Sequence, residues 1–249
     1  MKATNQIFRM LKAKMNRKNT ILLSLSCIFV VVELHLSNLI QTTSPPNTIQ
    51  YLSVILACLF CILFAEKTIS YAFTQAGLLF TVLADFFLVY LENPNKLLAM
   101  LCFSVTQIAY FLRIYFEEES KILKKVHLIL RASLSLLIIV STVMVLGENT
   151  DALALVSMFY YVNLILNIVF AFFNFKKSWV LIFGLICFLI CDTFIGVSNM
   201  VAYINLENNP FLYTLLNPGF NAAWAFSVPS QMLLAISLLP NKLKRNCLN

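Results

Sequence analysis

Long apolar runs dominate this sequence, and each is long enough to cross a lipid bilayer once. A helix needs about 20 mainly apolar residues to span the roughly 30 Å hydrocarbon core, because each residue adds about 1.5 Å. Charged residues make up 12% of the chain, whereas a soluble domain carries about 25%. Since too few polar side chains are present to cover a water-facing surface, composition excludes soluble, disordered and disulfide-rich secreted proteins. We therefore expect an all-α polytopic membrane protein.

Polar, turn-forming segments divide the apolar runs into eight predicted membrane-spanning helices. They form one transmembrane bundle over residues 21–239, between a basic N-terminal arm (residues 1–20) and a basic tail (residues 240–249). The predicted spans are Ile21–Ile40, Ile49–Ala65, Tyr71–Leu91, Leu97–Phe116, Val126–Val145, Ala152–Phe173, Trp179–Ile204 and Phe220–Leu239.

The positions of the basic residues predict the orientation of these helices. With eight spans, both termini and alternate loops share one side, and that side holds 17 of the 18 Lys and Arg residues, all except Lys96. Basic residues gather on the cytoplasmic side of membrane proteins, so we expect both termini to be cytoplasmic. This topology and attraction to anionic lipids account for the net charge of +7, and we expect no nucleic-acid partner.

The cysteines favour neither a disulfide framework nor a metal site. There are seven, an odd number, and all but Cys247 fall within predicted spans. Cys58 and Cys61 have the spacing of a redox or zinc pair, but no second pair or histidine accompanies them. Because cysteine in such a setting behaves as a small hydrophobe, we expect no metal and no cofactor.

Three acidic residues lie inside predicted spans, namely Glu33, Asp85 and Asp192. An ionisable group in the bilayer costs a few kcal/mol even on lenient scales, so its presence is a functional hypothesis by default. Each acid lies some 13–15 residues into a helix that we expect to run outward, about 20 Å from its start. The three should therefore share one level. Glu33 could instead reach the membrane surface or pair with a basic group.

Uncharged polar residues should approach the same level from the inward-running helices. Side chains of this kind need partners in hydrocarbon, so they should face the bundle interior and line a polar cavity. A simpler interpretation is that they join helices by hydrogen bonds. That interpretation suits an asparagine better than a buried aspartate, because a neutral group would join helices at lower cost. The residues concerned are Gln107, Tyr110, Asn163 and Gln231.

A weak internal repeat connects the two aspartates. Residues 77–85 and 184–192 both read Gly, Leu, six apolar or small residues and Asp, and Phe follows two positions later in each. The repeat places Asp85 and Asp192 four spans apart in helices of the same orientation, which is consistent with a parallel four-plus-four helix repeat. Chance similarity between apolar segments is the alternative.

Short motifs along the chain resemble those of one membrane-enzyme family. They are Leu83-Ala84-Asp85 in the third span, Gln107-Ile108-Ala109-Tyr110 and Tyr115-Phe116 in the fourth, Cys191-Asp192-Thr193 in the seventh and Ala225–Gln231 in the eighth. With eight spans, this layout resembles a divergent member of the YhhN/TMEM86 lysoplasmalogenase family. That family typically shows Gly-Asp, His-Leu-Leu-Tyr, Ser-Asp and a final Tyr-x-x-x-Gln-like helix.

The resemblance implies hydrolysis of the vinyl ether bond of lysoplasmalogens to a fatty aldehyde and a glycerophospho-alcohol. Asp85 and Asp192 would be the catalytic pair, one as a protonated acid and one as a carboxylate, without a metal. The substrate, a lysophospholipid within membrane lipid, would contact the remaining polar residues of the spans. These are Gln107, Tyr110, Gln231, Asn163 and Glu33.

Two departures from the family pattern keep other functions open. Gln107 replaces the family histidine and cannot exchange protons, and the Lys-Pro usual at the start of the second helix is absent, since Gln50 and Tyr51 stand there. One alternative is a proton-coupled transporter of a small molecule or lipid, which would use the same carboxylates. A second is an inactive relative that binds lipid.

Overall fold

The structure, a computed structural model, describes residues 48–64, 68–173, 175–200 and 222–238, and every regular element within these ranges is helical. Five of the described helices are long and apolar enough to cross a membrane, and two more are shorter apolar helices. This confirms the all-α class and indicates a multi-pass membrane protein. The elements are α2 (Thr48–Phe64), α3 (Ile69–Asp85), the π-helical η1 (Phe86–Tyr90), α4 (Lys96–Glu117), α5 (Lys121–Leu146), the 3-10 turn η2 (Gly147–Asn149), α6 (Ala152–Phe173), α7 (Phe175–Met200) and α9 (Ala222–Ile236).

The helix ends follow from capping residues that hydropathy does not detect. Three N-cap side chains each accept a hydrogen bond from the backbone N–H three residues later: Thr68 before α3, Asn95 before α4 and Ser120 before α5. Because of the last cap, α5 begins at Lys121, five residues before the predicted start of its apolar run. Gly147 ends α5 with φ of 53°, a conformation that glycine adopts without steric cost.

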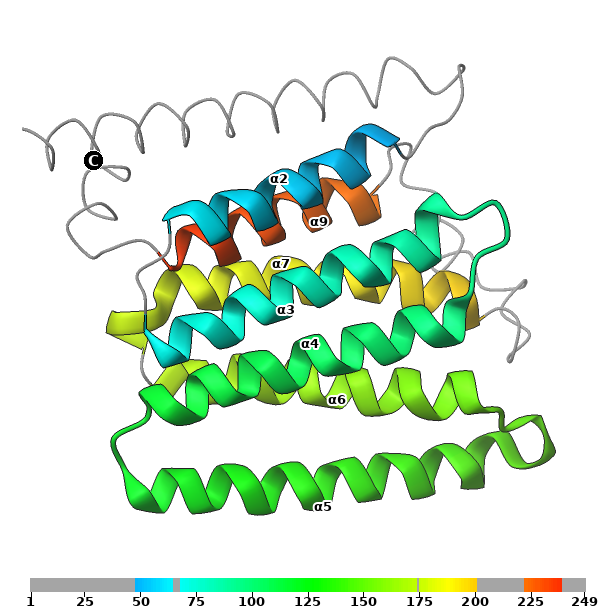
Figure 1. Cartoon of the computed structure of the whole chain (residues 1–249). Coiled ribbons are helices and arrows are strands. Elements are labelled where there is room, and N and C mark those ends of the chain that lie inside the picture. The colour runs from blue at the N-terminus through cyan, green and yellow to red at the C-terminus, as the bar shows by residue number, and fades with distance from the viewer. Residues whose placement is uncertain (1–47, 65–67, 174, 201–221, 239–249) are drawn as a thin grey trace, which may run out of the picture.

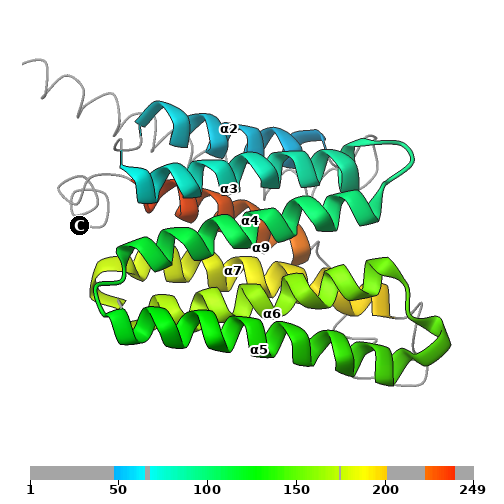
Figure 2. The same cartoon turned by 60° about the horizontal axis from the view of Figure 1, so that its bottom comes forward.

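Of the seven α-helices that the structure describes, six are joined in a closed ring of contacts, and α5 lies outside it. Figures 1 and 2 show α5 at the edge of the bundle. Around the ring, α3 contacts α4, α4 contacts α6, α6 contacts α7, α7 contacts α9, α9 contacts α2, and α2 contacts α3. The remaining helix, α5, packs along α6. The most deeply buried large side chains include Leu164 of α6, Leu185 of α7 and Leu234 of α9, so the core lies where these elements meet.

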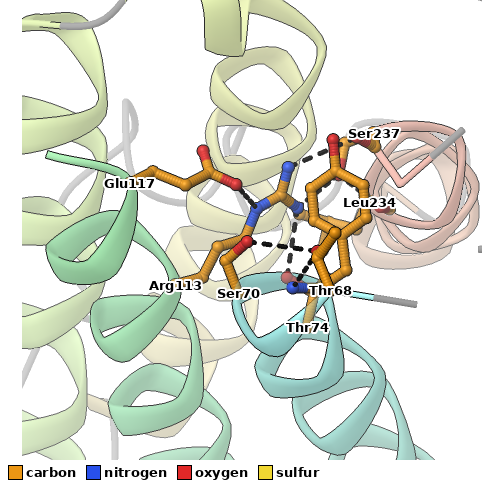
Figure 3. A network of polar contacts seen from close by, with 8 residues as sticks. Thr68, Ser70, Thr74, Arg113, Glu117, Leu234 and Ser237 are labelled. Carbon is orange, nitrogen blue, oxygen red and sulfur yellow. Dashed lines mark hydrogen bonds and ion pairs between the residues drawn. The ribbon is translucent and has the colours of Figure 1, made fainter. Parts of the chain in front are cut away.

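A buried arginine joins three helices near one end of the ring (Figure 3). Arg113 of α4 is 2% exposed. Its Nη1 donates to Oγ1 of Thr74 in α3 at 3.1 Å and to Oγ of Ser237, just after α9, at 2.6 Å. Its Nε pairs with Glu117 one turn later at 3.2 Å, and its guanidinium lies over the ring of Tyr71. This charge is fully partnered, which is the condition for tolerating it inside the bundle.

Several expectations from the sequence fall outside the described residues. They include the first span, the acid Glu33 within it, the basic arm over residues 1–20 and the tail over residues 240–249. The count of eight helices, the cytoplasmic termini and the repeat as a whole therefore stay predictions.

Candidate functional site

Asp85 occupies an irregular point of the backbone. It is the last residue of α3, and the π-helical turn η1 begins at Phe86. Its side chain is only 6% exposed, and within the described residues its Oδ2 has no hydrogen-bond partner. Single π turns interrupting an α-helix occur frequently at functional sites. A buried carboxyl oxygen without a partner is costly, so this position is poorly explained by helix packing alone.

Asp192 of α7 lies within electrostatic range of Asp85. The two carboxyl groups interact electrostatically, although they come from helices that are far apart in the sequence. Asp192 is partly buried, and its Oδ2 accepts a hydrogen bond from the hydroxyl group of Tyr160 in α6. Next to Asp85, the phenol of Tyr51 in α2 also lies within electrostatic range. Four helices of the ring thus contribute side chains around the pair.

Gly77, at the start of the first repeat segment, is a close contact point between α3 and α4. Its carbonyl oxygen accepts a hydrogen bond from Oγ1 of Thr106 at 3.1 Å. The ring of Tyr110, one turn further along α4, lies where a side chain on this glycine would be: an added Cβ would come within 2.5 Å of Cε1. Gln107 follows Thr106 directly.

The second repeat segment makes the same kind of contact between α7 and α9. The carbonyl oxygen of Gly184 accepts a hydrogen bond from Oγ of Ser230 at 2.9 Å. Leu234, one turn further along α9, lies against the glycine, 3.0 Å from an added Cβ. Gln231 follows Ser230 directly. The two segments therefore match in their glycine contacts and in the glutamine beside them, as well as in their aspartates.

Gln107 and Gln231 are both buried without full hydrogen bonding. They are 0% and 1% exposed, and Nε2 of each lacks an acceptor among the described residues. In the same part of the chain, Oε1 of Gln231 lacks a donor, and the hydroxyl group of Tyr110 has no hydrogen-bond partner. From the sequence we expected these residues at the level of the aspartates. In the structure they lie at a different level. Thr106 fixes Gln107 beside Gly77, eight residues from Asp85 along α3, which is about 12 Å.

An aromatic layer separates the two polar levels. The ring of Phe103 in α4 lies 5.7 Å from that of Tyr160 and 5.9 Å from that of Phe188 in α7. Phe188 stands one turn from Asp192 on one side and one turn from Gly184 on the other. The site is therefore layered, with carboxyl groups at one level and amide groups at the next.

Asn163 belongs to the contact between α5 and α6. It accepts a hydrogen bond from Nη1 of Arg131, and its Nδ2 donates to the carbonyl oxygen of Phe159 at 2.7 Å and to Oγ of Ser135 at 3.3 Å. All of its polar atoms are used in joining helices. These contacts agree with the simpler interpretation that this residue joins helices by hydrogen bonds.

The sequence did not reveal Tyr160 or Arg131 as part of the polar interior. A tyrosine is common in a membrane helix, and Arg131 reads as one more basic residue near a cytoplasmic loop. A signal for Tyr160 did exist: antiparallel pairing of α6 and α7 aligns Tyr160 with Asp192 and Tyr161 with Thr193, whose hydroxyl groups lie 2.8 Å apart. This alignment could be used only once it was known that α6 and α7 are neighbours.

No arrangement suited to a metal ion is found among the described residues. Five cysteines in this part of the chain are free thiols: Cys58, Cys61, Cys102, Cys187 and Cys191.

Comparison with known proteins identifies the family. The searches of curated proteins and of solved structures return no match. The family model described as the YhhN family matches residues 47–215, more than half of the chain. The matched range includes Asp85, Gln107, Tyr160 and Asp192. With its helical membrane fold, the match shows that this chain belongs to the YhhN family.

Proposed function

We propose that this protein is a membrane-embedded hydrolase that cleaves the vinyl ether bond of lysoplasmalogen-type lysophospholipids. The observation that supports the proposal is that two carboxyl groups, from α3 and α7, lie within electrostatic range of each other inside an apolar helical bundle. Neither aspartate has a basic partner among the contacts described above. A salt bridge within the described residues therefore does not explain their presence. Membership of the YhhN family supports the same assignment.

The reaction needs an acid and a carboxylate. Protonation of the alkene carbon that does not carry the ether oxygen breaks the carbon–carbon π bond and gives an oxocarbenium ion. Water adds to this ion and loses a proton, and the resulting hemiacetal collapses to a fatty aldehyde and a glycerophospho-alcohol. One carboxylic acid supplies the first proton, and one carboxylate stabilises the cation and takes the proton from water. No net proton is consumed.

The hydrogen bonds distinguish the two aspartates. Asp192 accepts the hydroxyl proton of Tyr160, an arrangement that suits a carboxylate, because an ionised carboxyl group can only accept. Oδ2 of Asp85 has no partner among the described residues, so a proton on it is not committed to another protein group. We therefore assign Asp85 as the acid and Asp192 as the carboxylate that stabilises the cation.

The test is aldehyde release from lysoplasmalogen by the purified protein in detergent. Asp85→Asn and Asp192→Asn should each lower the rate by about 10²- to 10⁴-fold, the usual contribution of acid–base catalysis. Asp151→Asn is the matched control, because Asp151 caps α6 through the N–H of Ala154 and asparagine caps as well. Wild-type rates in either interior variant would refute the catalytic pair. Absence of release, together with substrate-dependent flux in liposomes, would instead indicate a transporter.

A further inference from the structure

Arg131 places a positive charge deep in the least covered helix. It is the eleventh residue of α5, about 15 Å from the helix start. The side chain is partly buried and reaches across to α4, where its guanidinium lies 4.3 Å from the centre of the Phe111 ring. Most of α5 faces outward within the described part of the chain: it packs mainly along α6, and it is the least buried of the five candidate membrane spans. Figure 1 shows this helix at the edge of the bundle.

Among the described residues, the hydrogen-bond partners of Arg131 are all uncharged. Nη1 donates to Oδ1 of Asn163, and Nη2 donates to Oδ1 of Asn167 at 2.6 Å. Nη2 also lies 3.0 Å from Nε2 of His127. A guanidinium can only donate, so this imidazole nitrogen accepts and the ring is neutral, with its proton on Nδ1. Unlike Arg113, which pairs with Glu117, Arg131 keeps its full charge within this cluster.

The same cluster has more donors than acceptors. Asn167 uses its Nδ2 to donate to the backbone oxygen and to Oε1 of Gln107, at 2.9 and 3.0 Å. At the two ends of this chain, Nε of Arg131 and Nε2 of Gln107 are buried and find no acceptor in the described part of the protein. One uncompensated charge and two donor nitrogens without acceptors are costly in an apolar setting. Together they are what an anionic acceptor would satisfy.

We propose that Arg131, with Gln107, binds the phosphate group of a lysophospholipid. Arginine suits this ligand because its planar donors match phosphate oxygens. A ligand in the membrane could approach the side chain along α5, since this helix is the least buried of the five candidate membrane spans. The choice of a lysophospholipid as the carrier of the phosphate rests on the proposed function. Gln107, which stands where the family has a histidine, then acts as a donor to the ligand and needs no proton exchange.

The spacing along α6 fits one ligand that reaches both polar levels. Tyr160 contacts Asp192, and Asn163 and Asn167, which hold Arg131, follow about one and two turns later. One turn is about 5.4 Å and two turns are about 11 Å, so the three-carbon glycerol unit between the ether oxygen and the phosphate covers about the first turn of this distance. A lysophospholipid with its vinyl ether at the aspartates therefore extends its phosphate toward Arg131.

The test measures binding and does not require cleavage. The purified full chain is given an alkyl lysophosphatidylcholine, which has no vinyl ether, and separately the matching alkylglycerol, which has no phosphate. Arg131→Met removes the charge. Asn163→Asp keeps the arginine held but neutralises it with a carboxylate, and the hydroxyl group of Ser135 can turn to donate to the new oxygen. Lys125→Met, an exposed residue of the same helix, is the control.

We expect the wild type to bind the phosphate-containing lipid at least about tenfold more tightly than the alkylglycerol, the value of one charge-assisted contact. Both interior variants should lose this difference while binding the alkylglycerol as before, and Lys125→Met should keep it. Equal affinities in the wild type, or a difference that persists in both variants, would overturn the proposal. A purely structural Arg131 would weaken both ligands together.

In a further binding measurement, the protein is given inorganic phosphate alone. We expect it not to bind at concentrations that saturate the lipid, because a free ion must leave water without an acyl chain to bring it to the membrane. Arg131-dependent binding of inorganic phosphate without binding of the lipid would overturn the lipid as the source. Since the alkyl lipid cannot be cleaved, an inactive protein that still binds it would refute the proposed catalysis and leave this site intact.

Discussion

Individual residues show how this bundle treats buried charge. Arg113 is surrounded by a carboxylate, two hydroxyl groups and a carbonyl oxygen, whereas the partners of Arg131 in the described ranges are all neutral. The first arrangement stabilises the fold, because each of the three guanidinium nitrogens has an acceptor. The second leaves a charge available to a ligand. Two arginines on neighbouring helices thus serve different purposes, and the difference lies in their partners.

Arg113→Lys should destabilise the protein, because lysine cannot reach Thr74, Ser237 and Glu117 at once with a single ammonium group. We expect a loss of about 1.5–3 kcal/mol, the value of hydrogen bonds to a charged group. The measurement is the free energy of unfolding in a denaturing detergent titration. Glu117→Gln, which keeps an acceptor beside Nε, is the control and should cost less. Equal losses would show that the ion pair with Glu117 dominates.

Tyr160→Phe should lower kcat for vinyl ether cleavage and leave KM nearly unchanged, because the tyrosine positions Asp192 and does not hold the lipid. Loss of one such positioning contact should slow the chemical step roughly tenfold. Steady-state kinetics separates the two parameters. Tyr161→Phe removes the neighbouring contact with Thr193 and serves as the control. A rise in KM with constant kcat would assign Tyr160 to substrate binding instead.

At the scale of elements, two glycine contacts hold the ring together. Gly77 lets α3 approach α4, and Gly184 lets α7 approach α9, each with a hydroxyl group bonded to its carbonyl oxygen. Small residues at such contacts are typical of membrane helices, because packing replaces the hydrophobic effect as the force between them. The aspartates lie on α3 and α7, so each contact holds one of the two helices that carry them against its neighbour.

Gly77→Ala should therefore destabilise the fold and displace Tyr110, since the new Cβ would lie 2.5 Å from its ring. Overpacking of this kind costs about 1–3 kcal/mol. Gly196→Ala is a matched control within α7, because nothing lies within 4 Å of the added atom there, and alanine favours a helix by up to about 1 kcal/mol. Unfolding titrations should move in opposite directions. A shift of the same sign in both would contradict the packing argument.

For the molecule as a whole, the described helices agree with alternating passage through a membrane. Lys96 begins α4 at one end of the bundle, where its Nζ donates to Asn199 near the end of α7. The lysines that open α5 lie at the opposite end, across the length of α4 (Figure 1). The predicted orientation places the second end in the cytoplasm, because 17 of the 18 basic residues fall on that side.

Cysteine labelling tests this orientation directly. In a cysteine-free background, Asn93→Cys should react with a membrane-impermeant maleimide in intact cells, and Lys121→Cys should react only after the membrane is permeabilised. Both positions are exposed, so access depends on the side of the membrane alone. The reverse pattern would place the termini outside.

The sequence by itself determined the class of protein, the positions of the described helices and the aspartates worth examining. Apolar run length and charge asymmetry are local properties, and bilayer thickness converts them directly into spans. Capping shifted one boundary, at α5, because a helix continues beyond its apolar part when a side chain satisfies its free N–H groups.

Tertiary structure decided which polar residues meet. From the sequence, distance along a helix gave depth only relative to an assumed membrane boundary, so the glutamines were expected beside the aspartates. The contact of Thr106 with Gly77 places them about two turns away. Likewise, the pairing of Tyr160 with Asp192 and the neutral surroundings of Arg131 depend on which helices are neighbours. Hydropathy cannot supply that information, because lipid-facing and core-facing sides of a membrane helix are both apolar.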